Sequence, residues 1–350
     1  MQLLSGAEAI VVDTLSFGRA TEGPVLSFTD SDLRSAVEEL WTEETLLVTD
    51  DYNYPKIRDI GRTVAVEDTE ARRITEVISS GGYSRVIAIG GCTALDFGRA
   101  CAIGRPLAAV PTILSNCCLS SSRSVIRRDD HYRSEETTAP QLTVISRPTI
   151  EENHADRRKN WSASGLGDLF SAFAAVAEAN WHAQTPGPVN GLFRQQAPIC
   201  WEALEWIDSA AYPLDRDGLE RLARLLHEFS IAGHKSVPIG SEHVLYYLLR
   251  KRQNYSRMVA THGKLVSIGT LITLRAWSEA RGDFSMYEKL RHAFAKIGLP
   301  RTFSDLDSIG VKTEHLVSAG RIFANDSLYG RLFNKDGASP LTAVFATSSS

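Results

Sequence analysis

The feature that most constrains the fold of this chain is a change in the pattern of apolar residues near residue 150. Before it, short apolar runs such as TLLVTDD (45–51) and SRVIAIGG (84–91) alternate with polar segments of helical spacing. After it, long alanine- and leucine-rich segments place apolar residues three and four positions apart. Continuous apolar runs predict parallel strands buried on both faces, whereas spacings of three and four predict helices. We therefore predict an α/β domain with a parallel sheet, followed by an all-α domain.

The expected helices and strands follow from these two patterns of apolar residues. In the first half we expect a helix at 72–82 and strands at 45–51, 84–91, 106–112 and 141–148. In the second half we expect helices at 165–181, 217–233, 241–252, 262–280 and 285–298. The polar stretch IEENHADRRKN (150–160) separates the two parts of the chain that carry these patterns. We accordingly predict domains at 1–155 and 156–340, and a flexible, serine-ending tail at 341–350.

Composition removes several classes of partner. A chain of 350 residues, 43% of them hydrophobic, can fill the cores of two ordinary domains. A formal net charge of −4 offers no broad attraction to nucleic acid or to anionic membranes. The N-terminus lacks the basic and apolar regions of a signal peptide, and no stretch reaches the ~20 apolar residues of a membrane span. Five cysteines, an odd number, argue against a secreted disulfide framework. We expect a cytoplasmic protein with a small-molecule substrate.

Two glycines follow the strand expected at 84–91. In GGCTALDFGRA (90–100), Gly90 and Gly91 precede a segment that can continue as a helix. Their backbone N–H groups could bind a pyrophosphate at the helix N-terminus. The same glycines also suit a tight strand-to-helix turn that binds nothing. The spacing is not G-x-G-x-x-G, so the ordinary Rossmann fingerprint is absent.

Two acids close the strand expected at 45–51. Asp50 and Asp51 fall where an open α/β sheet presents the carboxyl ends of its strands to a nucleotide. A carboxylate there can accept a hydrogen bond from a ribose 2′-hydroxyl and would repel a 2′-phosphate, which favours NAD over NADP. The alternative is a solvated turn at the end of the strand.

A third set of candidates lies in the helical half. Asp168, His243 and His262 each fall near the start of an expected helix, in SGLGD, GSEH and THG. One carboxylate and two imidazoles suit Zn²⁺ or Fe²⁺ and leave positions open for a substrate oxygen. Taken alone, each histidine is better explained by a capping or packed surface role than by metal ligation. Only convergence in the fold would make the three residues one site.

Five segments occur in one characteristic order along the chain. They are GGCTALDFGRA (90–100), VPTILSNCCLSSSRSVI (110–126), SGLGDLFSAFAAVAEAN (164–180), GSEHVLYYLL (240–249) and THGKLVSIGTLITL (261–274). As a set they resemble the iron-containing alcohol dehydrogenase and dehydroquinate-synthase-like superfamily, nearest its glycerol dehydrogenase and glycerol-1-phosphate dehydrogenase branches. The corresponding family patterns are GGG-x-x-x-D-x-x-K-A, VPT-x-x-S-T-D-A-x-x-S-x-x-SVI, S-G-x-G-D-A, GSEH and HG-x-x-V-x-x-GTL.

This resemblance implies a fold, a cofactor and a set of site residues. The implied fold is dehydroquinate-synthase-like, with a Rossmann-like nucleotide domain, a helical domain and an active site in the cleft between them. Asp168, His243 and His262 are the implied metal ligands, catalytic through the metal, with zinc favoured over iron. The resemblance also implies NAD(H) rather than NADP and a homo-oligomer. The residues implied to surround the cofactor are Asp50, Gly90, Gly91, Cys92, Asp96, Thr112, Ser115, Ser121, Arg123 and Arg127.

Some residues of the phosphate loop and its surroundings depart from the family pattern. Cys92 replaces the third glycine of the loop, and Arg99 replaces the usual lysine, which keeps the charge but changes its geometry. Arg123 and Arg127 could reach the cofactor or an anionic substrate group, and they could equally lie on a solvated face.

The segment beside the substrate departs more strongly. Where the family has S-T-D-A, this chain has Ser115, Asn116, Cys117 and Cys118, so a thiol replaces a carboxylate that lies beside the substrate hydroxyls. A thiol is a weak acceptor, which disfavours glycerol as substrate. Catalysis by Cys117 is the less favoured interpretation, because small buried cysteines are usually inert. We expect Asn116, Cys117 and Tyr247 near the substrate; Tyr247 replaces a second histidine of related enzymes.

The leading hypothesis is a metal-dependent NAD(H) oxidoreductase that interconverts a small polar alcohol and its aldehyde or ketone. We expect a specialised biosynthetic intermediate rather than glycerol as the substrate. The alternatives are a glycerol-1-phosphate dehydrogenase-like enzyme and a sugar-phosphate cyclase of the dehydroquinate synthase type. Such cyclases carry VDSS-x-GGKT after the PTT motif, whereas residues 119–123 lack its glycines and lysine. A non-catalytic binding protein is disfavoured because all three metal ligands are retained.

Overall fold

The computed structural model of the chain describes two units. The described residues are 23–129, 131–156, 159–183, 191–232, 240–252, 260–320 and 344–345. Within these residues, the first unit comprises the described parts of Met1–Thr112 and Ser122–Thr149, and the second comprises those of Ile113–Ser121 and Ile150–Ser350. Of the tail predicted at 341–350, only Val344 and Phe345 are described, and both are buried.

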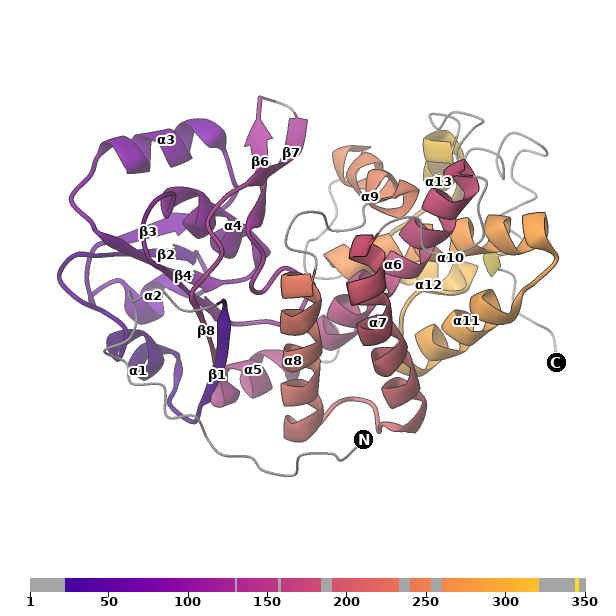
Figure 1. Ribbon diagram of the computed structural model, residues 1–350, viewed down its shortest axis with the longest axis horizontal. Helices are drawn as coiled ribbons and strands as arrows, with labels where there is room; N and C mark the ends of the chain where they lie inside the picture. The colour runs from indigo at the N-terminus through magenta and orange to yellow at the C-terminus, as the bar shows by residue number, and fades with distance from the viewer. Residues whose placement is uncertain are drawn as a thin grey trace. The chain divides into compact units, whose positions relative to one another are not determined.

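The first unit contains a six-stranded, all-parallel sheet (Figure 1). Its strands lie in the order β1-β8-β5-β4-β2-β3. The four strands expected from the sequence are present as β2 (Thr45–Asp50), β4 (Arg85–Gly90), β5 (Leu107–Pro111) and β8 (Leu142–Ser146). The two edge strands, β1 (Val25–Thr29) and β3 (Thr63–Val66), were not expected. With the helical second unit, this sheet confirms the predicted fold class.

The strand order reverses direction between β2 and β4. From β2 the chain continues to β3 on one side, whereas from β4 it continues to β5 on the other, and β2 and β4 are paired neighbours with Thr49 opposite Ile89. Open α/β sheets bind ligands at the carboxyl ends of strands at such a switch point. Asp50 and Gly90, the last residues of these two strands, therefore lie at the switch point.

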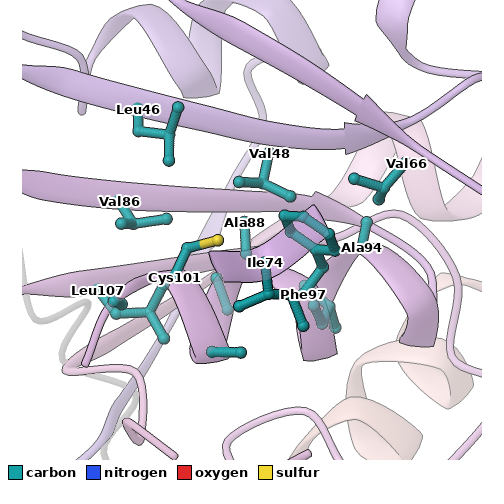
Figure 2. Packing of buried hydrophobic residues seen from close by; sticks show 14 of the residues in the cluster. Leu46, Val48, Val66, Ile74, Val86, Ala88, Ala94, Phe97, Cys101 and Leu107 are labelled. Carbon is teal, nitrogen blue, oxygen red and sulfur yellow. The ribbon is translucent and has the colours of Figure 1, made fainter. Parts of the chain in front are cut away.

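Helices cover both faces of the sheet, which explains why its strands are apolar throughout. One face packs against α3 (Ala71–Ser79) and α4 (Cys92–Cys101), and Phe97 and Cys101 of α4 lie against the side chains on this face of the sheet (Figure 2). The other face packs against α1 (Leu33–Glu38) and α2 (Tyr54–Ile57). Because side chains alternate along a strand, Leu46 and Val48 point to the first face.

An antiparallel hairpin, absent from the predicted elements, lies between β5 and β8 in the sequence. It consists of β6 (Arg123–Arg128) and β7 (His131–Glu136). Its outer strand is largely exposed and polar, so it carries no apolar run that would identify it. The guanidinium of Arg128 makes two contacts with the carboxylate of Glu135, at 2.5 and 2.8 Å.

The second unit is helical in its described residues (Figure 1). The five expected helices are found as α6 (Trp161–Ala183), α8 (Arg216–Ala232), α9 (Ser241–Arg252), α10 (His262–Arg281) and α11 (Ser285–Ile297). Those not expected are α5 (Arg147–His154), α7 (Gly191–Ser209), α12 (Phe303–Ser308) and α13 (Thr313–Gly320). No helix in the described ranges is both long and apolar enough to cross a lipid bilayer.

Two details correct the sequence-based expectations. The stretch 150–160, taken as a polar separator, is helical as far as His154, because its apolar residue Ile150 is buried. Helix α6 begins at Trp161 rather than at residue 165, so Asp168 lies about two turns into the helix and not near its start.

The burial of Phe97 predicts a large stability effect. The side chain has no exposed surface and fills the space between α4 and the sheet, so Phe97→Ala should lower the free energy of unfolding by about 3–5 kcal/mol. Urea denaturation of the full chain measures the change. In the control Ile103→Ala, the side chain is 57% exposed, and we expect a loss of about 0.5 kcal/mol or less. Equal losses in the two variants would contradict this account of the core.

Candidate metal centre

Helices α6 and α10 approach each other backbone to backbone through glycines. A β-carbon at Gly263 would lie 1.7 Å from the carbonyl oxygen of Ser164, and one at Gly167 would lie 2.7 Å from the carbonyl oxygen of Gly263. The N–H of Gly263 donates to the Ser164 hydroxyl at 3.0 Å. No side chain could be accommodated at Gly263 without moving the helices apart. This approach brings Asp168 of α6 beside His262, the first residue of α10.

A third helix, α9, also packs against α10 through a glycine. A β-carbon at Gly269 of α10 would lie 2.5 Å from the α-carbon of Glu242 in α9. The backbone of α9 therefore lies directly against α10. His243, the third residue of α9, is carried to the side of Asp168.

Asp168, His243 and His262 converge as one cluster. One carboxylate oxygen of Asp168, Oδ1, lies 3.2 Å from His243 Nε2 and 3.0 Å from His262 Nε2. The three ligand atoms all lie within 4.8 Å of one another. Asp168 and His243 are buried, and His262 is half-buried. An oxygen and two imidazole nitrogens so placed suit Zn²⁺ or Fe²⁺, and three protein ligands leave room for a substrate oxygen.

The second oxygen of Asp168 is held by Cys117. Oδ2 accepts a hydrogen bond from the backbone N–H of Cys117 at 2.8 Å and one from its thiol at 2.9 Å. The carboxylate is therefore oriented with Oδ1 toward the two imidazoles. Asp168 would therefore offer a metal only Oδ1, beside the two imidazole nitrogens.

The charges of the cluster shift its pKa values strongly. Burial alone would raise the pKa of Asp168, but the two imidazoles hold it well below its usual value. Burial alone would lower the pKa of His243, but hydrogen bonds to Asp168 and Glu242 raise it to about 10. At neutral pH the imidazole of His243 in the metal-free protein is therefore positively charged, with a hydrogen on each ring nitrogen. A metal that binds Nε2 must displace the hydrogen there.

A buried serine–histidine contact, which sequence reasoning missed, anchors the segment that carries Cys117. Ser120 Oγ lies 2.6 Å from Nδ1 of His227 in α8, and the Ser120 N–H donates to Ser230 Oγ at 3.1 Å. Burial, assisted by the charge of Arg224, lowers the pKa of His227 to about 4, so its imidazole is neutral. No local spacing in the sequence signals a contact between residues so far apart.

At the switch point of the sheet, Asp50 contacts the glycine loop. Its Oδ2 accepts from the N–H of Gly91 at 3.1 Å, and its Oδ1 accepts from the backbone and side-chain nitrogens of Asn53 at 3.0 and 2.8 Å. Gly90 has a φ of +132°, and a β-carbon there would lie 2.2 Å from Asp50 Oδ2. The position therefore requires glycine. Cys92, the first residue of α4, is half-buried.

Other residues expected near the cofactor have protein partners in the first unit. Asp96 pairs with buried Arg99 at 2.7 Å and accepts from the N–H of Val125 at 3.2 Å, which connects α4 to the hairpin. Arg127 pairs with Asp68 at 2.8 Å and with Glu70 at 3.4 Å.

Two further residues of that expected set also have partners in the first unit. Arg123 donates to Ser134 on β7, through Nε to the hydroxyl at 3.0 Å and through Nη2 to the carbonyl oxygen at 2.8 Å. Thr112 Oγ1 accepts from Asn53 Nδ2 at 3.3 Å.

The remaining expected residues belong to the second unit. Ser115, Asn116 and Ser121 are buried within Ile113–Ser121, the same segment that carries Cys117. The carbonyl oxygen of Ser115 accepts from the Ser164 hydroxyl at 2.8 Å. The ring of Tyr247 lies 5.0 Å from that of Tyr246, whose own ring meets His262 edge-on at 4.4 Å. Their roles toward cofactor and substrate remain predictions.

Comparison with known proteins agrees with this architecture. Residues 45–150 match the family model of iron-containing alcohol dehydrogenases. A glycerol dehydrogenase of Pseudomonas putida is 27% identical over 252 residues, a match that spans 68% of this chain and 66% of that protein.

Two solved structures share the fold. A probable glycerol dehydrogenase from Sinorhizobium meliloti 1021 has a TM-score of 0.62 at 19% identity, covering 83% of this chain and 85% of that one. A sulfoacetaldehyde reductase from Bifidobacterium kashiwanohense, solved in complex with NAD+, has a TM-score of 0.60 at 14% identity, covering 86% and 91%.

If the cluster binds metal, single histidine variants should lose it. Because each imidazole supplies one of three ligand atoms, His243→Ala and His262→Ala should no longer retain stoichiometric zinc through gel filtration. Metal analysis of the purified full chain measures this. His292→Ala, at an exposed position on α11, is the matched control and should keep its zinc. Unchanged zinc in both ligand variants would refute the assignment.

The raised pKa of His243 predicts proton release on metal binding. Its pKa moves from 6.5 to about 10, so its contribution to the stability of the metal-free protein is complete below pH 6.5 and is lost as the pH rises through 10. Zinc must displace this proton, so zinc affinity should rise with pH, by about tenfold per unit near neutrality. A pH indicator in weak buffer should record about one proton released per zinc at pH 7. Zinc binding without proton release would contradict this electrostatic account.

Proposed function

We propose that this chain, whose residues 45–150 match the family model of iron-containing alcohol dehydrogenases, is a metal-dependent NAD(H) oxidoreductase that interconverts a small polar alcohol and its aldehyde or ketone. The observation that carries this proposal is the convergence of Asp168, His243 and His262 from three helices. These three side chains are far apart in the sequence and have the chemistry of a catalytic metal site with an open position.

The residues of the chain hold and orient the reacting groups. A bound divalent metal would supply Lewis-acid polarisation of the substrate oxygen, and the nicotinamide would supply the two-electron redox chemistry. Asp168 Oδ1 and the two imidazole Nε2 atoms would hold the metal, while Cys117 fixes the opposite side of the carboxylate. We propose zinc over iron, by similarity to the glycerol dehydrogenase branch.

The sheet of the first unit supports NAD(H) as the cofactor. Gly90 and Gly91 end a strand at the switch point and precede the N-terminus of α4, where backbone N–H groups favour phosphate. Asp50 adds a negative charge beside this loop, which disfavours the 2′-phosphate of NADP. The sulfoacetaldehyde reductase of similar fold was solved with NAD+.

The Cys117 position supports a substrate other than glycerol. Its thiol is buried, donates its hydrogen to Asp168, and offers a substrate hydroxyl only the weak acceptor of a thiol sulfur. We propose a small polar carbonyl or alcohol that is a specialised biosynthetic intermediate. The sulfoacetaldehyde reductase of similar fold is named for an aldehyde substrate, which is consistent with this proposal.

Two further proposals concern the setting in which the enzyme works. None of the five cysteines, all of which lie in described residues, forms a disulfide, which supports a reducing cytoplasm. A homo-oligomer is proposed by resemblance to the family.

A substrate panel tests the reaction class. Zinc-loaded protein should change the absorbance of reduced nicotinamide with at least one small alcohol, aldehyde or ketone, because oxidation and reduction of the cofactor accompany each turnover. Zinc-free protein is the control. A product formed without any net change in the nicotinamide would exclude a dehydrogenase and favour the cyclase alternative.

A stronger acceptor at position 117 tests the substrate argument. Cys117→Ser keeps a hydrogen that can be donated to Asp168 Oδ2 and replaces sulfur by an oxygen, which accepts more strongly from a second substrate hydroxyl. We expect kcat/KM for glycerol to rise by about threefold to tenfold. Steady-state kinetics with glycerol and with a monohydroxy alcohol measure the preference. Cys118→Ser, at the half-buried neighbouring thiol, is the control and should leave the preference unchanged. A Cys117→Ser enzyme with no gain on glycerol would contradict the argument.

A further inference from the structure

We infer that Glu242 is the positioning residue that holds His243 in the orientation required to bind a metal. The inference rests on the proposed metal-dependent function and extends it to a residue outside the ligand set. Glu242 is the second residue of α9, immediately before the ligand, and its side chain has no exposed surface.

The hydrogen bonds of His243 assign one ring nitrogen to each neighbour. Its Nδ1 lies 3.0 Å from Glu242 Oε1, and its Nε2 lies 3.2 Å from Asp168 Oδ1. An ionised carboxylate can only accept, so Nδ1 carries the hydrogen that it donates to Glu242. When that hydrogen stays on Nδ1, Nε2 is the nitrogen that can offer a lone pair to a metal. Such carboxylate–histidine–metal arrangements fix the ring and raise the basicity of the ligand.

This contact does not follow from the helix alone. Side chains of adjacent residues on a helix point in different directions and do not normally face each other. Here Glu242 turns back toward the start of α9, where Oε1 also accepts the N–H of Gly240 at 2.8 Å. The turned-back conformation brings the carboxylate to His243.

The surroundings of Glu242 prevent the side chain from leaving. On the α10 side, a β-carbon at Gly269 would lie 2.5 Å from the α-carbon of Glu242 and 2.9 Å from its β-carbon. On the α6 side, Glu178 accepts from the N–H of Ser241 at 2.7 Å and from the Ser241 hydroxyl. The first turn of α9 therefore contacts both neighbouring helices.

Burial of the Glu242 carboxylate costs folding free energy, so its presence in the core needs an explanation. Glu242 Oε2 is buried without a hydrogen-bond partner in the structure's described part, and a buried acceptor in that state destabilises the fold. No Lys or Arg among the described residues pairs with Glu242; its ion-pair partner is His243. Capping through Oε1, which accepts the N–H of Gly240, accounts for one contact of Glu242 but not for its contact with Nδ1 of His243. A role at the metal centre does account for it.

Two substitutions at position 242 separate positioning from mere packing. Glu242→Leu keeps most of the volume and removes the acceptor, whereas Glu242→Gln keeps a carbonyl oxygen that can still accept from Nδ1. The dissociation constant for zinc is measured on the full chain by competition with a chromophoric chelator. We expect Leu to weaken zinc binding by about 10- to 100-fold and Gln by about threefold or less. Equal losses in both variants, or no loss in either, would overturn the inference.

The wild-type protein provides an independent readout if the Leu variant fails to fold. In zinc-loaded protein with 15N-labelled histidine, NMR should show His243 with hydrogen on Nδ1 and metal on Nε2. Metal on Nδ1 would overturn the inference without any variant. Glu178→Gln is the matched control for loss of a buried charge at the start of α9. It should lower the melting temperature while leaving the His243 signature and zinc affinity unchanged.

Neither measurement requires turnover, so the two proposals can fail separately. A protein that binds zinc through this arrangement but oxidises no alcohol would refute the proposed function alone. A protein that oxidises alcohols but binds zinc equally well with Leu and Glu at position 242 would refute the positioning role alone.

Discussion

The helical unit depends on the contact between the backbones of α6 and α10. Gly263 and Gly167 allow an approach that any side chain would prevent, and Gly269 extends the same contact to α9. The separation of the three candidate ligands is thus determined by helix packing, which is more rigid than a loop. A methyl group at Gly263 would act on the metal centre although it touches none of the ligands.

Each of two ligands is oriented by a residue that does not bind the metal itself. Cys117 donates hydrogen bonds to Oδ2 of Asp168 and leaves Oδ1 facing the imidazoles. Glu242 accepts a hydrogen bond from Nδ1 of His243. Two buried carboxylates therefore surround one imidazole. The negative charge that would attract a cation is the same charge that raises the pKa of His243, so metal affinity and proton affinity are coupled through this ring.

The sequence allowed four of the six strands of the parallel sheet and five helices of the second unit to be predicted, because buried parallel strands and amphipathic helices leave local patterns. It did not reveal the hairpin β6–β7, whose exposed polar strand has no such pattern. The candidate metal ligands were identified by family resemblance, since their spacing alone is uninformative. The Ser120–His227 contact joins residues 107 positions apart and has no local signature. Glu242 was overlooked for the opposite reason, because adjacent helical residues are not expected to face each other.

The segment Ile113–Ser121 gives the helical unit an unusual connectivity. The chain enters that unit after Thr112, leaves it at Ser121 to form the hairpin and β8, and returns at Ile150. A gene fragment beginning at residue 150 would therefore encode the three ligands but not the N–H of Cys117 that orients Asp168, nor the hydroxyl that meets His227. During synthesis, this short segment leaves the ribosome well before the helices that receive it. Completion of the metal centre must accordingly wait until α9 and α10, which are made later, join a segment from the first half of the chain.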